Sequence, residues 1–345
     1  MEEILEYKKI AKVNQSSLKK ILHSPGAYKA AVNKYEESTE SHFVFGSLVD
    51  DMLLAPKTVD DKYYKMPDSD ISTTLKLIAQ HVYEAAKLNP IDDSGKVSCP
   101  LHDIYYQDLI LNAKRTYAYQ PRWKDETAIT NIVKSCSNYF NALIESNGKV
   151  IISIEEYNKA LTCVAMLKSD KYTSKYLVKP SQDISIFTHV VLEFETEGVK
   201  CKAELDKVFI DHINKTIQPI DYKTTGMPIN GFKYEFWKYR YDFQAAFYKL
   251  GLSQDSKIIK LLEDGYELLN FRYIVVNSDG NDNPMIFVVP KEVNAIGLHG
   301  GKLDNGRTLE GVHQAIGRYQ YHTVNDAWDY PREYYQREGS LIIEL

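Results

Sequence analysis

Three ionisable side chains stand in a stretch of sequence that is otherwise rich in apolar and β-branched residues. Asp206 ends the segment AELD, and Asp221 and Lys223 flank a tyrosine in the segment DYK shortly afterwards. A buried charge is costly unless it is paired or binds an ion. The stretch therefore contains either a salt-bridged strand edge or a metal site.

The spacing of these residues allows a metal site. Alternate residues of a strand share a face, so Asp221 and Lys223 emerge side by side. Asp206 lies on the preceding strand, which a short turn joins to the strand of Asp221, so the two carboxylates can meet. A divalent cation with hard oxygen ligands would remove their mutual repulsion, and the lysine could orient or deprotonate a bound water or steady a phosphate. A D-x-K motif alone is more often a salt-bridged pair of edge charges, but with Asp206 it suits metal-assisted phosphodiester hydrolysis.

The elements that position these residues follow from the periodicity of the sequence. The segment IEEYNKALTCVAMLKSD is an amphipathic helix, and DISIFTHVVLEFETEG, VKCKAELDKVFID and TIQPIDYKTT are three successive strands. A helix over YEFWKYRYDFQAAFYKLGL, a strand over LLNFRYIVVNS, another over PMIFVVP and a helix over LEGVHQAIGRYQYH follow. The order helix, three strands, helix, strand predicts an α/β (α+β) fold with a mixed sheet flanked by helices.

The first half of the chain is predicted to be mostly helical. Two short helices are expected in VNQSSLKKILHSPGAYKA, the first capped by Asn14 or Ser16 and the second beginning at Pro25. A further helix over SHFVFGSLVDDMLLAP ends before Pro56. We expect one compact domain, with a helical part over 1–150 that contributes to the active site, a catalytic core over 151–290 and a C-terminal helix and tail over 291–345.

The composition indicates a globular protein. The chain has 345 residues, of which 44% are hydrophobic and 26% charged, as in ordinary globular domains. No apolar run approaches the roughly 20 residues of a membrane span, and the N-terminus lacks the apolar core of a secretory signal. We therefore expect a cytoplasmic protein. The net charge of −5 gives no global sign of nucleic-acid binding, for which a local basic groove would suffice.

The cysteines exclude two classes of site. Cys99, Cys136, Cys163 and Cys201 stand far apart without a C-x-x-C pair, so they form neither a zinc ligand set nor a disulfide framework, and we predict buried free thiols. An iron–sulfur nuclease would need three cysteines near the C-terminus, whereas none follows Cys201. A helicase fusion is excluded as well, because no G-x-x-x-x-G-K-[ST] loop occurs.

The combination of D…D-x-K with this strand order resembles the PD-(D/E)XK nuclease superfamily. Leu205 stands where the proline that names the motif would be. In the following helix, QAAFY supplies Gln244 and Tyr248, which lie four residues apart and hence on one helical face. This pair resembles the Q-x-x-x-Y motif of the exonuclease branch, which includes phage recombination exonucleases.

Two N-terminal segments narrow the resemblance. NQSSLKKILHSPGAYKA is similar to the S-x-S-x-L…SP-x-x-Y opening of exonuclease VIII (RecE-type) domains, with Asn14 in place of the first serine. FGSLVDDMLLAP is similar to their G-x-x-x-H…L-x-P helix, with Asp50 in place of the histidine that ligates the metal and Asp51 adjacent as an alternative. DISIF resembles their E-x-S-x-F strand and would bring Asp183 near the sheet edge.

The resemblance implies a restriction-endonuclease-like core that uses Mg²⁺ (or Mn²⁺) to hydrolyse DNA. The implied catalytic residues are Asp206, Asp221 and Lys223; the implied metal ligands are Asp50, Asp206, Asp221 and the backbone carbonyl of Tyr222; and the implied DNA contacts are Gln244, Tyr248, Thr224 and Thr225. It also implies a phage 5′→3′ exonuclease that resects linear double-stranded DNA ends for recombination. Related enzymes act as homo-oligomeric rings, and a single-strand annealing protein is a further expected partner.

Two other functions stay open from the sequence. A sequence-specific or structure-specific endonuclease of the same fold shares D…D-x-K, although Q-x-x-x-Y and the N-terminal segments argue against it. A non-catalytic DNA-binding relative is expected to lose Lys223 or an acidic ligand, and both are present. Cleavage of end-labelled linear and circular duplexes would discriminate between the three.

Overall fold

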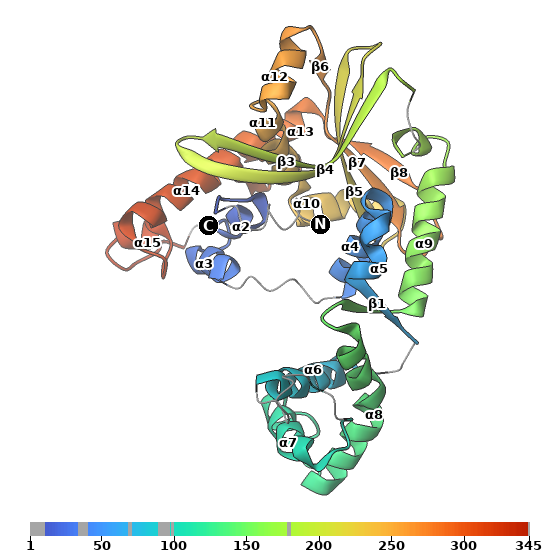
Figure 1. Cartoon of the computed structure of the whole chain (residues 1–345). Coiled ribbons are helices and arrows are strands. Elements are labelled where there is room, and N and C mark those ends of the chain that lie inside the picture. The colour runs from blue at the N-terminus through green and yellow to red at the C-terminus, as the bar shows by residue number, and fades with distance from the viewer. Residues whose placement is uncertain are drawn as a thin grey trace. The chain divides into compact units, whose positions relative to one another are not determined.

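The structure is a computed structural model that describes residues 11–33, 41–67, 71–88, 97, 100–177 and 181–343. The chain divides into two compact units, 1–56 together with 159–345, and 57–158 (Figure 1). This division differs from the predicted boundary near residue 150. The residues up to Pro56 belong with the sheet rather than with the helices that follow them in sequence.

The first unit is built on a mixed sheet. Its strands lie in the order β3-β4-β5-β7-β8, with β6 pairing at one end of β5 (Figure 1). The neighbours are antiparallel except for β5, which runs parallel to β7 and β6. The strands are β3 (Ile184–Thr196), β4 (Val199–Asp211), β5 (Thr216–Thr225), β6 (Glu267–Leu268), β7 (Arg272–Asn277) and β8 (Met285–Val288).

The alternating apolar pattern of these segments explains their pairing. β3 and β4 form a long hairpin through the turn at Glu197 and Gly198, both of which have positive φ, as such a turn requires. β5 lies between β4 and β7, and six consecutive residues from Ile217 to Tyr222 are buried, as expected for a central strand. The predicted mixed α/β fold with flanking helices is confirmed.

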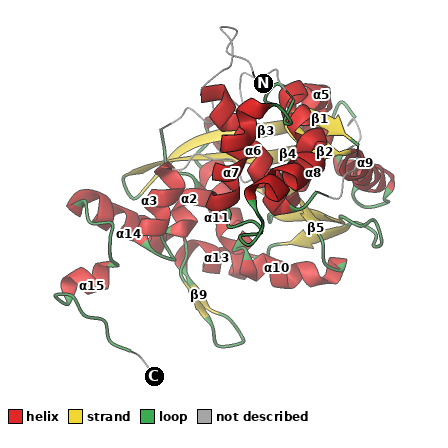
Figure 2. Ribbon diagram, turned by 90° about the horizontal axis from the view of Figure 1, so that it is seen from below, coloured by secondary structure: helices red, strands yellow, loops and turns green. Residues whose placement is uncertain are grey.

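Helices of the first unit cover this sheet (Figure 2). α11 packs against β3 and β4 and also contacts α13 and α14, while α4 packs against β5. A short antiparallel ladder, β9 (Gly301–Lys302) with β10 (Thr308–Leu309), joins α13 to α14. The helices are α2 (Gln15–Lys20), α3 (Pro25–Asn33), α4 (Ser41–Leu54), α9 (Ile154–Ser169), α10 (Phe232–Lys238), α11 (Tyr241–Leu252), α12 (Ser256–Glu263), α13 (Lys291–His299), α14 (Val312–Asn325) and α15 (Arg332–Gln336).

The second unit has its own apolar core. Long helices pack on one another around the fully buried side chains of Ile78, Tyr106, Ile132 and Phe140. This unit also contains two short parallel strands, β1 and β2, which were not predicted from the sequence. Its elements are α5 (Val59–Lys62), β1 (Tyr63–Met66), α6 (Thr73–Leu88), α7 (Gln107–Thr116), α8 (Asp125–Ser146) and β2 (Val150–Ser153).

Local signals in the sequence mark several boundaries correctly. The Asn14 side chain caps α2 by accepting a hydrogen bond from the Ser17 N–H at 2.9 Å, and α3 begins at Pro25. Cys136, Cys163 and Cys201 are buried free thiols, as predicted, whereas Cys99 lies outside the described residues. In the described part of the chain no helix has the length and apolar character that crossing a membrane requires.

Candidate active site

Asp206 and Asp221 stand where two neighbouring strands separate. The β4–β5 ladder ends at the pair Lys207 and Ile220, so the next residues in register are Asp206 and Asp221 themselves. There the ladder is replaced by a hydrogen bond from the Tyr222 N–H to Asp206 Oδ2, at 2.8 Å. The two carboxylates are thus brought together at this point of the sheet, as the sequence predicted.

Both oxygens of the Asp221 carboxylate have partners. Asp221 is only 2% exposed, and its Oδ1 forms an ion pair with the Lys223 ammonium. Its Oδ2 accepts a hydrogen bond from Gln244 Nε2 at 3.2 Å. The Lys223 ammonium also lies 5.4 Å from the centre of the Tyr241 ring, a distance at which a cation is attracted to the ring face.

Gln244 and Tyr248 lie on one face of α11, as expected, and form a buried network beside Asp221. Gln244 Nε2 also donates to the Tyr248 hydroxyl at 3.1 Å, and its Oε1 accepts a hydrogen bond from the Tyr273 hydroxyl at 3.3 Å. Both side chains are 7% exposed. In this arrangement they orient the Asp221 carboxylate, and the DNA contact that the resemblance implies stays a prediction.

The helix α4 brings Asp50 to the same place. A Cβ atom on Gly46 would lie 3.4 Å from Thr224 Oγ1, so the glycine lets α4 approach β5 closely. Burial, followed by the charges of Asp206 and Asp221, raises the pKa of Asp50 well above its usual range, while Lys223 acts in the opposite direction. Asp50 therefore shares the electrostatic environment of the two strand carboxylates, as predicted.

The cluster contains more carboxylates than its lysine can balance. Burial and the Asp221 charge raise the pKa of Asp206 to about 7, and burial also raises the pKa of Asp221. Burial alone would lower the pKa of Lys223, but the charges of Asp221 and Asp206 hold it well above its usual range. The cluster thus holds acidic protons together with one ammonium group.

The donor set fits a hard divalent cation in its chemistry. Three carboxylates in a shielded place are the oxygen donors that Mg²⁺ or Mn²⁺ takes, and such an ion would compensate their repulsion. The positions of the side chains do not yet form a metal site. Among the described residues, no three Asp, Glu, His or Cys side chains are placed so that they could hold a metal ion together.

His189 on β3 is a member of this cluster that the sequence analysis missed. The β3–β4 ladder pairs Thr188 with Lys207 and Val190 with Leu205, which places His189 across from Asp206. Its pKa is raised, first by a hydrogen bond with Glu204 and further by the charges of Glu204, Asp206 and Asp51, against the effect of burial. No sequence motif marks His189, because the residues that act on it, Glu204, Asp206 and Asp51, lie on strand β4 and helix α4.

Three further predicted residues, Asp51, Thr225 and Tyr222, differ in their surroundings. Asp51 is buried on α4, and its charge acts on His189 and Asp50. The Thr225 hydroxyl is buried and accepts the Met227 N–H at 3.1 Å, so it stabilises the turn after β5. For Tyr222 the structure shows the N–H bond to Asp206, and the role of its carbonyl stays a prediction.

Asp183 stands at the sheet edge, because it directly precedes the edge strand β3, but it does not belong to the cluster. It precedes β3, where its carbonyl accepts the His212 N–H at 2.8 Å. At a rise of about 3.3 Å per residue, it lies roughly 20 Å along the strand from His189. A strand-end charge is the simpler account of Asp183.

Basic residues of α2 lie near Lys223. Lys19 donates a hydrogen bond to the Tyr239 carbonyl at 2.7 Å. Burial, followed by the charges of Lys223, Lys20 and Arg240, lowers the pKa of Lys19 to about 8, while the charge of Asp242 acts in the opposite direction. Two of these cations, Lys223 and Arg240, are paired with the carboxylates of Asp221 and Asp242.

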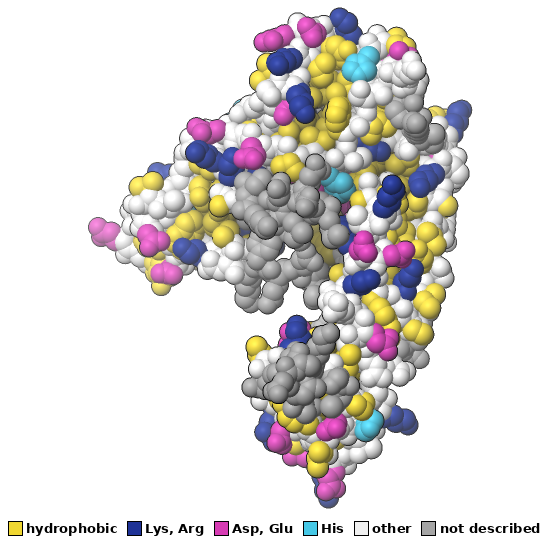
Figure 3. Space-filling model, viewed as in Figure 1, with side chains coloured by type: hydrophobic (Ala, Val, Ile, Leu, Met, Phe, Trp, Pro, Cys, Tyr) yellow, Lys and Arg dark blue, Asp and Glu magenta, His cyan; other side chains and the backbone are white. Residues whose placement is uncertain are grey.

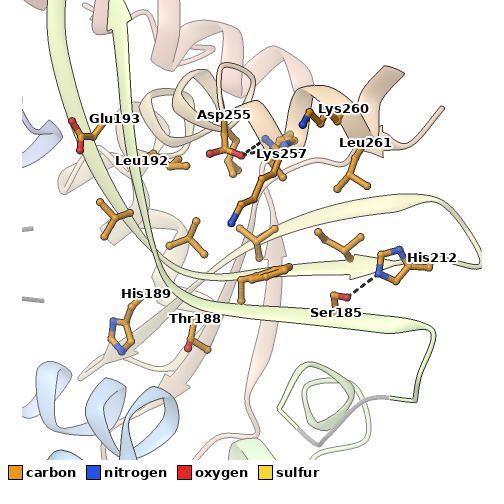
Figure 4. A pocket seen from close by; sticks show the side chains of 17 residues that line it. Ser185, Thr188, His189, Leu192, Glu193, His212, Asp255, Lys257, Lys260 and Leu261 are labelled. Carbon is orange, nitrogen blue, oxygen red and sulfur yellow. Dashed lines mark hydrogen bonds between the residues drawn. The ribbon is translucent and has the colours of Figure 1, made fainter. Parts of the chain in front are cut away.

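A cavity of about 750 Å³ lies between β3 and α12. Its walls are largely apolar, with Lys257 and Lys260 among the polar lining residues, and hydrophobic side chains gather beside α12 on the face in Figure 3. Figure 4 shows the His189 ring turned away from the centre of this cavity. The carboxylates Asp50, Asp206 and Asp221 do not line the cavity, so the cavity is not the place where they meet.

Comparisons with known proteins leave the function to be argued from the side chains. No protein-family model matches the sequence, and no curated protein matches it significantly. A solved structure from Eubacterium rectale, named "Putative exonuclease", matches with a TM-score of 0.43 and 12% identity, over 97% of this chain and 90% of that chain. A similarity this distant says nothing about the activity of this chain.

Proposed function

We propose that this chain is a Mg²⁺- or Mn²⁺-dependent deoxyribonuclease that hydrolyses phosphodiester bonds at the cluster of Asp50, Asp206, Asp221 and Lys223. The observation that carries the proposal is the meeting of Asp206 and Asp221 where β4 and β5 separate, with Lys223 paired to Asp221. A salt-bridged strand edge would account for one carboxylate and one lysine. It does not account for three carboxylates with raised pKa values around the Lys223 ammonium.

Each residue of the cluster has its own role in the proposed reaction. Asp50, Asp206 and Asp221 would hold the divalent cation, which when bound activates water and neutralises charge on the phosphate. Lys223, whose pKa the charges of Asp221 and Asp206 hold well above its usual range, would steady a nonbridging phosphate oxygen as a cation. Gln244, held by Tyr248 and Tyr273, keeps the Asp221 carboxylate oriented.

The finer part of the proposal is an exonuclease that resects linear duplex ends in the 5′→3′ direction, in a phage recombination system. Its support is the resemblance of QAAFY, NQSSLKKILHSPGAYKA and FGSLVDDMLLAP to the corresponding exonuclease motifs. A homo-oligomeric ring in the cytoplasm and a single-strand annealing partner belong to the same proposal. A closed ring around DNA would make processivity a consequence of topology.

The test is cleavage of 5′- and 3′-labelled duplexes, linear and circular, with Mg²⁺ or with EDTA. We expect the linear duplex to be shortened from its 5′ ends only with the metal, and the circle to survive. Digestion in chelator would contradict the metal-dependent mechanism, and cleavage of the circle would establish an endonuclease. Asp221→Asn and Lys223→Ala should each lower the rate more than about 100-fold, or roughly 2.7 kcal/mol.

A matched control separates catalysis from surface charge. Lys257→Ala removes an exposed lysine of α12 and should leave the rate unchanged. If Lys223→Ala lost no more activity than Lys257→Ala while both proteins stayed folded, Lys223 would have no catalytic role.

A further inference from the structure

His189 lies across from Asp206 in a part of β3 where the regular ladder is interrupted. The pairs on either side, Thr188 with Lys207 and Val190 with Leu205, belong to the ladder, whereas His189 and Asp206 do not. His189 has a φ of 50°, in the left-handed region that non-glycine residues rarely adopt. Such strain persists only where the surroundings impose it, and it is concentrated at functional sites.

One side of the His189 ring is held by a carboxylate. Nδ1 lies 3.1 Å from Oε1 of Glu204 on β4. A carboxylate at this nitrogen places a proton on Nδ1 and leaves the lone pair on Nε2. A metal-ligating histidine has this arrangement, because a carboxylate or carbonyl on the other nitrogen fixes the tautomer and the orientation of the ring.

The other side of the ring has no hydrogen-bond partner among the described residues. Nε2 of His189 is buried, and none of the described residues forms a hydrogen bond with it. A buried nitrogen without a partner costs about 1–3 kcal/mol. The charges of Asp206 and Asp51 act on this ring, and it points away from the centre of the neighbouring cavity (Figure 4). The ring is thus held through Nδ1 by Glu204, while its Nε2 remains without a hydrogen bond beside the acidic cluster.

We propose that His189 is a ligand of the catalytic cation, binding it through Nε2 beside Asp206, and that Glu204 positions its ring. This inference rests on the proposed function and adds a nitrogen donor to an otherwise all-oxygen set. Imidazole favours transition metals over Mg²⁺. The site should therefore bind Mn²⁺ more tightly than Mg²⁺, by a margin that depends on His189.

The test is Mn²⁺ binding to the full chain without DNA, followed by electron paramagnetic resonance, including detection of a directly coordinated nitrogen. The wild type should show the nitrogen coupling. His189→Asn should lack it and bind Mn²⁺ about 10–100-fold more weakly, with a smaller loss for Mg²⁺. Asparagine tolerates the left-handed backbone, so this variant should fold. Glu204→Gln should weaken Mn²⁺ binding about tenfold while keeping the coupling.

A matched histidine controls for general effects on the strand pair. His212 bonds to Ser185 and Tyr266 at the far end of the β3–β4 hairpin, so His212→Ala should bind Mn²⁺ as the wild type does. A wild type without nitrogen coupling, or a His189→Asn protein with unchanged Mn²⁺ affinity, would overturn the inference.

The proposed function fails in a different way. If Asp206→Asn and Asp221→Asn bound Mn²⁺ as tightly as the wild type, the proposed cation site itself would be wrong. If these two lost Mn²⁺ while His189→Asn kept it, the site would stand and only the ligand role of His189 would fall.

Discussion

The carboxylates of Asp50, Asp206 and Asp221 share one environment with a single ammonium. Their pKa values are raised first by burial; the charges of Asp206 and Asp221 raise the pKa of Asp50 further, and the charge of Asp221 raises that of Asp206. In the metal-free protein a raised carboxyl pKa means that the folded state holds protons that the unfolded state has released. The same groups that would bind the cation therefore make the metal-free fold less stable as they ionise.

The stabilisation that Mg²⁺ gives should consequently depend on pH. Asp206 has a folded pKa of about 7 against about 3.9 when unfolded, so its contribution to metal-free stability is full below about pH 4 and is lost as pH rises through 7. A bound cation offsets this loss. We expect the increase in Tm caused by Mg²⁺ to grow from pH 5 to pH 8, measured by thermal unfolding at fixed ionic strength. An increase that is constant over this range would argue against Asp206 as a ligand.

Replacing Asp206 by asparagine should separate stability from activity. The amide removes the repelling charge, and its Oδ1 can still accept the Tyr222 N–H. We expect Asp206→Asn to abolish cleavage and to raise the metal-free Tm at pH 8 by at least about 2 °C, the shift expected for roughly 1 kcal/mol in a chain of this size. Asp304→Asn, in the exposed loop between β9 and β10, is the control and should change neither. A metal-free Tm below that of the wild type would mean that the Asp206 charge stabilises the fold.

At the level of elements, local signals located most of the helices and strands. Asn14 and Pro25 mark helix starts because capping and N1 preferences act within a few residues. The helix predicted over YEFWKYRYDFQAAFYKLGL is instead two helices, α10 and α11, separated by Arg240 with a φ of 57°. Arg240 is held there by Asp242 and by the Glu310 carbonyl. The carbonyl lies far along the chain, so no local pattern predicts the break.

For the candidate site too, local sequence patterns predict only some of the residues. Asp206, Asp221 and Lys223 could be found because they lie on strands whose alternation fixes which side chains share a face. His189 could not, because its significance comes from Glu204 and from its position across from Asp206. The resemblance placed Asp183 near the sheet edge, but a motif does not measure how far along the edge strand a residue lies from the cluster.

The close packing of α13 on α11 depends on a glycine of α13. A Cβ atom on Gly297 would lie 2.1 Å from the Asp242 carbonyl oxygen, whereas on Gly317 of α14 it would meet nothing within 4 Å. We expect Gly297→Ala to destabilise the protein by about 1–3 kcal/mol or more, as overpacking does. Gly317→Ala should stabilise it by about 0.5–1 kcal/mol.

Urea unfolding measures both changes. Because α11 carries Gln244, Gly297→Ala should also lower activity at temperatures where the protein is still folded. Equal stability of the two variants would show that α13 can move away from α11 without cost.

At the scale of the whole molecule, the chain contains two compact units with separate cores. Ile132 is fully buried in the core of 57–158, and Ile132→Ala should cost about 2–5 kcal/mol there. We expect hydrogen exchange to become faster in 57–158, while the amides of β4 and β5 keep their protection. Uniform loss of protection along the whole chain would show instead that the units unfold as one.

The order of residues along the chain also has a consequence for synthesis. Asp50 is made early, but Asp206, Asp221 and Gln244 emerge from the ribosome only after the whole of 57–158 has been translated. The local contacts of 57–158 can form while the partners of α4 do not yet exist, because short-range contacts need no long loop to close. An unfinished chain that ends before β5 lacks Asp221 and Lys223, so the proposed site does not yet exist. The discontinuous arrangement thus delays completion of the proposed site until most of the polypeptide has been made.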